Sequence, residues 1–481
     1  MDSLKKNFAY QLLYQLLVIS LPLITTPYVA RVLGAEKSGI YSYTNTVAYY
    51  FVIFGMLGIE QYGNRCIAQV RDDYDKLRIV FTELSVVHFI TSIIAVLGYV
   101  FYCLLLNSEY RIYFLIQGLQ VFSVIFDVNW FFWGIGKFRV TTIRSTVVKI
   151  VSVIAIFIFV RNEDDLINYV IILAGSILIT RFLIFISLRG YVRYTKVDFR
   201  SLTRHFKPVI IMFIAVIAAN LNRMVDKVML GAFGKIEDLG YYEYADRIIH
   251  VPLSVIAAIG TVMISKMSNS YLTNKDDEIE GLLDASACLV LYFSFGMAVG
   301  LAAISPEFIT LFLGSDYQKC ILIIIILSIS IPMVGWNNYI RTQILIPREM
   351  DLVYSRAVIC GAVCNIITNT FLITKFGAFG ASIATIISYL VILFMQIIPL
   401  FQYFHIKDYL KYALFPLAIS AVTFAFIRLL ARLNDNAELG LLLRIIIEMF
   451  AVVIVYGGLS YIYLRKKKPS LLNALIRKQR K

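Results

Sequence analysis

Apolar runs of about 20 residues recur along the whole length of the sequence, and they constrain its fold more than any other feature. A helix of that length spans the hydrocarbon core of a bilayer, which is about 30 Å thick. Only 16% of the residues are charged, against roughly a quarter in soluble domains. The sequence therefore predicts an all-α, polytopic membrane protein. It argues against a cytosolic enzyme, a nucleic-acid binder and a disulfide-rich secreted protein.

We predict about fourteen membrane-spanning helices in the 481 residues. Their approximate ranges are 9–31, 40–60, 80–106, 112–135, 143–161, 166–188, 208–231, 241–265, 283–304, 320–346, 353–374, 378–402, 409–430 and 441–464. The chain carries a net charge of +14, and roughly three times as many Lys and Arg residues fall on the side of the termini as on the other side. This asymmetry predicts that both termini are cytoplasmic.

A short pattern occurs twice in the chain, about 200 residues apart. Leu-Gly-Ala at residues 33–35 and again at 230–232 precedes a Gly-x-Tyr-x-Tyr segment, at 39–43 and 240–244. The repeat predicts an N-lobe at 1–205 with six helices and a C-lobe at 206–402 with six more. Residues 403–481 then hold two extra helices and a basic tail, which we expect to be either a short helix on anionic lipid or disordered. We expect Gly34 and Gly231 to cap their helices in the left-handed conformation, and residues 376–381 (FGAFGA) to form a tight, closely packed turn.

Six basic side chains fall inside the predicted spans, and each would cost about 2.5–3.5 kcal/mol if it faced lipid. These residues are Lys149, Arg181, Arg223, Lys227, Arg247 and Arg341. Each must face a protein interior or a wet cavity, unless it lies near a membrane surface and reaches the headgroups.

The outer half of the membrane is expected to hold three of these cations, Arg223, Lys227 and Arg247. Asn220, Arg223 and Lys227 share one helix face, and Asp226 lies one turn from Arg223, close enough to pair with it. Further members of this group are Arg31, Asp246, Arg247 and His250. Arginine matches phosphate oxygens and keeps its charge, so a converging group of cations would suit a di-anionic or poly-anionic substrate. Asp226, Asp246 or His250 would orient the bases or carry a coupling ion.

A second layer of polar and aromatic residues is expected at the inner ends of the spans. It comprises Glu60, Gln61, Asn64, Arg65, Asp127, Asn129, Trp130, Trp133, Lys149, Arg181, Asn337, Asn338, Arg341 and Gln343. Amides and aromatic faces bind sugars, and they also form the belts at membrane surfaces, so a sugar-facing surface, an inner gate and an interface belt all stay open.

No motif in the sequence indicates catalysis or a bound metal. The six cysteines are scattered, and no zinc-protease, nucleotide-binding or serine-hydrolase signature is present. We therefore expect no enzyme activity, no cofactor and no metal.

Several motifs, taken in order, carry a resemblance to a known family. They are residues 27–36 (PYVARVLGAE) with 39–41 (GIY), 58–65 (GIEQYGNR), 127–134 (DVNWFFWG), and 226–231 (DKVMLG) with 240–242 (GYY). The chain resembles the Wzx-type polysaccharide repeat-unit flippases of the MATE-like multidrug/oligosaccharidyl-lipid/polysaccharide exporter superfamily, and the resemblance covers its whole length.

The resemblance implies two six-helix lobes around a central cavity, with the two extra helices forming a groove for a lipid tail. The substrate would be a polyprenyl-pyrophosphate-linked oligosaccharide moved to the outer leaflet of a bacterial plasma membrane. Its pyrophosphate would be bound by Arg31, Arg223 and Lys227, with Arg65 and Arg247 as further candidates. The chain would act as a monomer beside polymerase and chain-length proteins.

Two alternatives fit the sequence less well. A multidrug or cation antiporter of the same superfamily needs acids at the centre of its cavity, where this chain has Arg223 and Lys227. A polysaccharide polymerase needs a sizeable outer loop, and no predicted outer loop is much longer than about 17 residues.

Overall fold

The structure is a computed structural model that describes residues 2–106, 108–196, 198–272, 276–400, 406–435 and 440–467. Within these ranges the side chains of some helical residues, among them 2–20 and 221–223, are not described. Every regular element in the described ranges is helical, which confirms the all-α prediction. The chain divides into two compact units, Met1–Gly231 and Ala232–Lys481. The seventh predicted span thus lies with the first unit, and the predicted lobe boundary after residue 205 stays a prediction.

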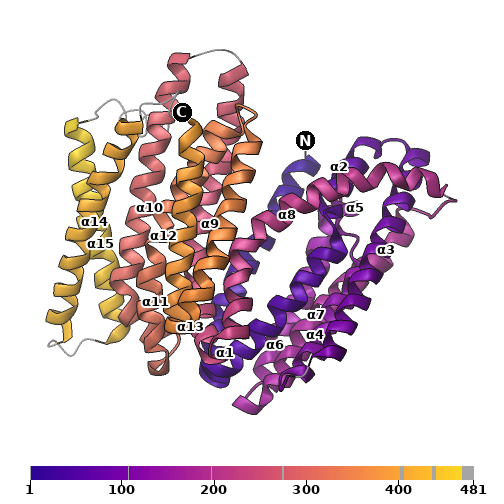
Figure 1. The fold of residues 1–481 in the computed structure, drawn as a ribbon, viewed down its shortest axis with the longest axis horizontal. Helices are drawn as coiled ribbons and strands as arrows, with labels where there is room; N and C mark the ends of the chain where they lie inside the picture. The colour runs from indigo at the N-terminus through magenta and orange to yellow at the C-terminus, as the bar shows by residue number, and fades with distance from the viewer. Residues whose placement is uncertain are drawn as a thin grey trace. The chain divides into compact units, whose positions relative to one another are not determined.

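The first unit contains eight α-helices and three short 3₁₀ helices in its described residues (Figure 1). They are α1 (Asp2–Met56), α2 (Ile59–Val70), α3 (Tyr74–Leu105), α4 (Arg111–Phe122), η1 (Ser123–Phe126), α5 (Asn129–Gly134), α6 (Phe138–Phe159), η2 (Glu163–Asp165), α7 (Leu166–Ile186), η3 (Ser187–Gly190) and α8 (Phe199–Phe233). Helix α1 packs against α3, α4 and α6, and α7 packs against α4 and α6.

The second unit is built from seven α-helices and three short helical segments in its described residues. They are α9 (Ile236–Leu272), α10 (Asp276–Phe312), η4 (Ser315–Tyr317), α11 (Gln318–Ser328), α12 (Ser330–Ile340), the π-helix η5 (Arg341–Leu345), α13 (Asp351–Ile397), η6 (Ile398–Leu400), α14 (Ile406–Asp435) and α15 (Leu441–Lys467). Helices α14 and α15 pack against each other and against α10 (Figure 1). Arg428 of α14 forms an ion pair of 2.9 Å with Glu307 of α10. The predicted basic tail lies outside the described residues.

The exposed side chains show why these helices suit a membrane. On α6, Val147, Val151, Ile154 and Ile158 are 54%, 58%, 53% and 48% exposed, and their spacing places them on one face. A soluble protein buries such a stripe, whereas lipid solvates it. Nine stretches of the described residues are long and apolar enough to cross a membrane. The chain is therefore a multi-pass membrane protein, and the count of fourteen spans stays a prediction.

The glycines of the repeated pattern have different roles in the two copies. Gly34 has a φ of 71° and a ψ of 176° and breaks α1 between the first two predicted spans. The positive φ requires glycine, as expected, but the ψ lies outside the left-handed helical region, so the cap differs from the one predicted. The same expectation is wrong for Gly231, which lies inside α8 without a positive φ. A β-carbon on Gly231 would overlap the ring of Tyr43, so close packing explains this glycine. Gly377 has a φ of 54° and makes the expected tight turn within α13.

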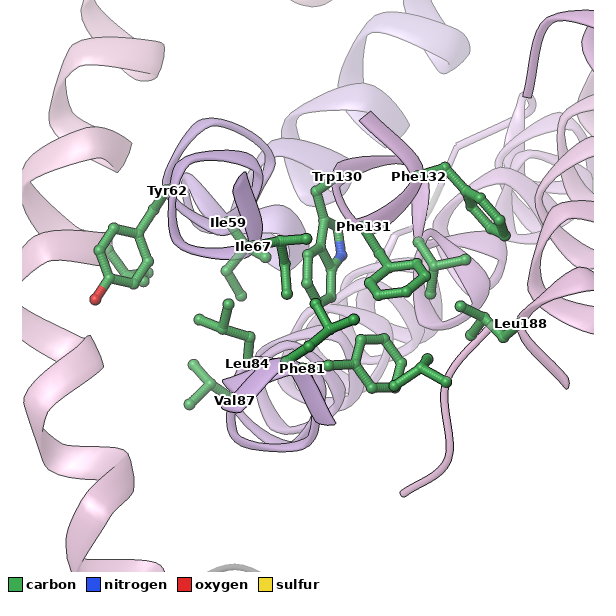
Figure 2. Packing of buried hydrophobic residues seen from close by; sticks show 14 of the residues in the cluster. Ile59, Tyr62, Ile67, Phe81, Leu84, Val87, Trp130, Phe131, Phe132 and Leu188 are labelled. Carbon is green, nitrogen blue, oxygen red and sulfur yellow. The ribbon is translucent and has the colours of Figure 1, made fainter. Parts of the chain in front are cut away.

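The aromatic core of the first unit lies where α2, α3, α5 and the carboxyl end of α7 meet (Figure 2). Trp130, Phe131 and Phe132 of α5 are fully buried, and the ring of Trp130 stacks on that of Phe81 with 5.7 Å between centroids. Ile67 contacts Gly134 closely, so that α2 and α5 are held together. This core fixes the positions of α2 and α5, which carry several of the predicted polar residues.

Helix α3 has an N-cap outside its apolar segment. The carboxylate of Asp73 accepts a hydrogen bond of 3.1 Å from the backbone of Lys76 and lies 2.9 Å from the Lys76 ammonium. These interactions hold the pKa of Asp73 below its ordinary value.

Candidate functional site

Two predicted spans are broken in the first unit. The span expected at 40–60 ends at Met56, and the chain passes through Leu57 and Gly58, with φ of 41° and 75°, before α2 begins. The span expected at 112–135 is interrupted at Asp127, whose backbone is extended. The segment Arg111–Gly134 is nevertheless long and apolar enough to cross a membrane, as predicted for 112–135, and the end of the span predicted at 40–60 stays a prediction. Non-helical backbone within a membrane protein is tolerated where it is buried or lines a wet cavity.

A cavity of about 450 Å³ lies at both breaks. Its polar lining consists of Glu60, Gln61, Asp127, Asn129, Thr141, Thr142, Ser145, Lys149, Ser176, Thr180 and Arg181. Tyr49 and Trp133 add aromatic rings, and Val216 of α8 adds an apolar contact. The lining thus comes from α1, α2, α5, α6, α7 and α8, together with the extended residue Asp127. All of these residues belong to the first unit.

An ion pair fixes one wall of the cavity. The Nε of Arg181 donates to the carboxylate of Asp127 at 2.9 Å, and the two side chains are 16% and 8% exposed. The Nη1 of Arg181 also donates to the hydroxyl of Ser123 at 2.7 Å. The other oxygen of Asp127 accepts hydrogen bonds from the backbone and side-chain nitrogens of Asn129, at 3.1 and 2.9 Å. Asp127 therefore binds the first residue of α5 and positions Arg181 at the same time.

The cavity lining also carries hydroxyls from α6 and α7. Thr141, Ser145 and Lys149 are spaced four residues apart along α6, so they lie on one face of that helix. The lipid-exposed residues Val147 and Val151 lie on a different face. The cavity thus offers donors and acceptors of both charge signs, several hydroxyls and an indole ring. Such a lining suits a ligand rich in hydroxyl groups better than a purely apolar or purely anionic ligand.

Most residues of the predicted inner layer that belong to the first unit line this cavity. Glu60, Asp127, Lys149 and Arg181 line it, although they come from distant parts of the sequence. Trp130 is instead fully buried in the aromatic core, where its indole N–H donates to the carbonyl of Asp127 at 3.2 Å. Trp133, one turn later, lines the cavity in its place.

Arg65 also lies apart from the cavity. It is exposed, and its guanidinium lies 5.6 Å from the ring centre of Tyr62. A cation over a tyrosine face gains some electrostatic stabilisation.

The predicted cations of the outer half are divided between the two units. Arg31 is exposed on α1, three residues before the Gly34 break. Asp226 of α8 is 1% exposed and lies close enough to Tyr50 to interact with it electrostatically. Lys227 is half-buried and Asn220 donates to the Val216 carbonyl at 2.8 Å.

Arg223 lies on α8, but its side chain is outside the described residues, so its expected pair with Asp226 stays a prediction. Because Arg247 and His250 belong to the second unit, the expected convergence of all these cations also stays a prediction.

In the second unit the charged residues predicted for the outer half of the membrane form local pairs along α9. Arg247 lies 2.6 Å from Glu243 and over the ring of Tyr244, whereas His250 lies 3.3 Å from Asp246. Both contacts span one helical turn.

Two further residues of the predicted inner layer make contacts within the second unit. Asn337 is 8% exposed and donates to the carbonyl of Tyr389 at 3.2 Å. Arg341 begins the π-helix η5 and lies 5.0 Å from the ring centre of Tyr354. A π-helical turn in a membrane helix often accompanies a functional site.

Sequence reasoning missed a buried cluster at the start of α8. The imidazole of His205 contacts the Tyr62 hydroxyl at 2.9 Å through Nδ1 and the Glu83 carboxylate at 3.0 Å through Nε2. Arg204, whose side chain is 56% exposed, forms a close ion pair with the buried Glu83. The cluster joins α8 to α2 and α3. No local motif signals it, because its members lie about 20 and 120 residues apart along the chain.

The whole sequence was compared with known protein families and proteins. Residues 4–270 match a family model described as "Polysaccharide biosynthesis protein". The "Putative O-antigen transporter" of Escherichia coli K12 is 22% identical over 391 residues, which cover 79% of this chain and 92% of that protein. The "Probable low-salt glycan biosynthesis flippase Agl15" of Haloferax volcanii is 24% identical over 172 residues, 35% of each chain.

A solved structure shares the fold. The structure entitled "Lipid II flippase MurJ, inward closed conformation" superposes with a TM-score of 0.76 at 18% sequence identity, over 95% of this chain and 99% of that one. At this identity the likeness establishes the fold.

Proposed function

This chain belongs to the polysaccharide biosynthesis protein family, and we propose that it is a flippase for lipid-linked oligosaccharides. It moves polyprenyl-pyrophosphate-linked repeat units from the cytoplasmic to the outer leaflet for surface polysaccharide synthesis. Its relatives named as an O-antigen transporter and a glycan flippase support this assignment.

The observation that carries the proposal is the polar cavity of the first unit. A membrane protein keeps an Arg–Asp pair, a lysine, a glutamate and several hydroxyls inside its fold only at a cost. That cost is met when the cavity receives a polar ligand. The described cavity of about 450 Å³ falls within the range of small-molecule sites and has room for sugar residues. In our proposal Glu60, Asp127 and Trp133 face the glycan, and Asn220, Asn337 and Arg341 are further sugar-facing or gating candidates.

The pyrophosphate is assigned to cationic side chains outside this cavity. We assign it to Arg31, Arg223 and Lys227, with Arg65 and Arg247 as further candidates. Guanidinium groups bind phosphate oxygens through paired hydrogen bonds and stay charged at every physiological pH.

Transport follows alternating access, in which the bound head group is exposed first to the cytoplasm and then to the outside. A membrane potential that is negative inside favours outward movement of the dianion by about 2.3 kcal/mol per charge per 100 mV. Asp226, Asp246 or His250 would carry the ion that couples the return step to a gradient.

The remaining assignments complete the proposal. The chain lies in a bacterial plasma membrane with both termini in the cytoplasm, and the polyprenyl tail of the substrate stays in contact with membrane lipid. It acts as a monomer that supplies the polymerase and chain-length proteins of its pathway.

The function is tested in cells by Arg223→Ala, with Arg223→Lys as the charge-preserving control. We expect Arg223→Ala to abolish surface polymer while polyprenyl-linked repeat units accumulate inside, at a normal protein level. Unpolymerised repeats in the outer leaflet would instead assign the chain to polymerisation. Normal surface polymer would remove Arg223 from the binding site.

A further inference from the structure

A second hollow in the first unit lies at the carboxyl end of α7. Its volume is about 570 Å³, and it shares no residue with the polar cavity. Its lining includes Phe182, Phe185 and Ile186 from the last turns of α7, and Arg189, Arg193 and Tyr194 from the segment that follows. We call it the α7 groove.

The segment that carries the arginines is anchored in the core. Leu188 and Val192 are 4% and 5% exposed and pack in the aromatic core cluster of the first unit. Arg189 and Arg193 each follow one of these anchors, and both are exposed. The buried pair thus holds the two arginines at a fixed spacing beside the groove.

The rest of the α7 groove is apolar and exposed. Phe182, Ile186 and Tyr194 are 45%, 44% and 58% exposed, and the ring of Phe185 packs on that of Phe126 at 5.5 Å. In a membrane-spanning helix, exposed rings and aliphatic groups contact acyl chains. The groove therefore combines a surface for hydrocarbon with a cationic edge.

The local charge favours an anion at this edge. Residues 189–207 contain six Lys and Arg residues and one acid, Asp198. In the part of the chain that the structure describes, Arg189 and Arg193 form no ion pair with an acidic residue. Clusters of basic residues at the cytoplasmic end of a membrane helix bind anionic lipid headgroups.

We propose that the α7 groove binds one anionic phospholipid of the surrounding membrane. Its phosphate lies at Arg189 and Arg193, and one acyl chain covers Phe182 and Ile186. The bound lipid would steady the end of the helix that carries Arg181, although the site itself does not depend on the transport function.

The test uses the purified full-length protein in detergent and counts retained lipids by native mass spectrometry. Phosphatidylglycerol and phosphatidylcholine of equal chain length are titrated separately into the protein. Inorganic phosphate and undecaprenyl phosphate are titrated in the same way in two further experiments. We expect one phosphatidylglycerol to be retained in preference to phosphatidylcholine. Each arginine near the headgroup contributes about fivefold in affinity, so Arg189→Gln/Arg193→Gln should weaken binding about 25-fold.

A matched control removes the same charge from the same segment. Lys196 and Arg200 are exposed and lie outside the groove lining, so Lys196→Gln/Arg200→Gln should change the affinity by less than about threefold. Ile186→Asn tests the acyl contact and should weaken binding while both arginines remain.

Four results would overturn the proposal. The first two are retention of phosphatidylcholine as strong as that of phosphatidylglycerol, and a loss of affinity in the control variant as large as in Arg189→Gln/Arg193→Gln. The other two are binding of inorganic phosphate as strong as that of phosphatidylglycerol, and stronger retention of undecaprenyl phosphate than of phosphatidylglycerol. The last result would make the groove an entry site for the substrate lipid.

Discussion

The ion pair between Asp127 and Arg181 allows a quantitative prediction. Arg181→Met removes the guanidinium from the Asp127 carboxylate, which is 8% exposed. Of the hydrogen-bond donors described above, the two nitrogens of Asn129 then remain. Removing one partner of a buried ion pair costs about 3–5 kcal/mol. Arg181 is 16% exposed beside the polar cavity, where water can reach the orphaned carboxylate. We therefore expect the lower end of that range, about 3 kcal/mol.

The double variant Asp127→Asn/Arg181→Met separates loss of the pair from loss of packing. The amide oxygen of asparagine can still accept the two hydrogen bonds from Asn129, and no unpaired charge remains. We expect it to lie within about 1 kcal/mol of the natural chain.

The assay is thermal unfolding of the purified protein in detergent, with Asp127→Asn completing a double-mutant cycle. The first unit covers Met1–Gly231, and for domains of that size about 1 kcal/mol shifts the Tm by about 2–4 °C. Arg181→Met should therefore lower the Tm by about 6–12 °C, and the double variant should shift it by no more than about 2–4 °C. Equal shifts for the single and double variants would refute the reasoning, because they would show that the two charges are not coupled.

Three further substitutions test other parts of the structure. Gly231→Ala should lower the free energy of unfolding by about 1–3 kcal/mol, because its β-carbon would overlap the Tyr43 ring. Adding Tyr43→Ala should restore part of that loss in the same unfolding assay. An unchanged Tm for Gly231→Ala would contradict this packing. His205→Ala removes a partner of the buried Glu83 carboxylate and should cost about 1–3 kcal/mol, whereas an unchanged Tm would mean that the cluster does not stabilise α8. The pKa of Asp73 is lower in the folded protein than in the unfolded chain, where it is about 3.9. Its contribution to the free energy of unfolding is therefore complete above the pKa of the unfolded chain and is lost as the pH falls through the pKa of the folded protein. Asp73→Ala should therefore lower the Tm at pH 7 and have little effect at pH 2.5, and an equal effect at both would exclude the charge as the cause.

The helices were predictable from the sequence because lipid solvates every apolar face, so the apolar runs mark their extent directly. The breaks at Gly58 and Asp127 were not predictable in the same way. Polar residues follow both breaks, among them Glu60, Gln61 and Asn129, but such residues also suit the end of a span at the membrane surface. The breaks are stabilised by contacts with distant elements. A β-carbon on Gly58, for example, would lie 2.7 Å from the backbone nitrogen of Phe213 in α8.

The site was predictable in its residue types and less so in its geometry. Charged and amide residues inside apolar runs marked Glu60, Asp127 and Arg181 as unusual, since each is costly in a membrane. Their pairing was not visible, because Asp127 and Arg181 are more than 50 residues apart and face each other only once α7 packs beside η1. The choice between Trp130 and Trp133 also depended on the short helix α5, whose start after the break decides which indole turns to the core.

The central claim is that the polar cavity of the first unit receives the glycan of a lipid-linked substrate. The most direct measurement fills that cavity and follows translocation of a polyprenyl-pyrophosphate oligosaccharide in proteoliposomes. Ser145→Trp places a large ring in the cavity, whereas Val151→Trp places the same ring on the lipid-exposed face of α6. We predict that Ser145→Trp abolishes the appearance of glycan on the far side while Val151→Trp leaves it unchanged, with both variants equally folded. Unchanged translocation by Ser145→Trp would contradict the claim.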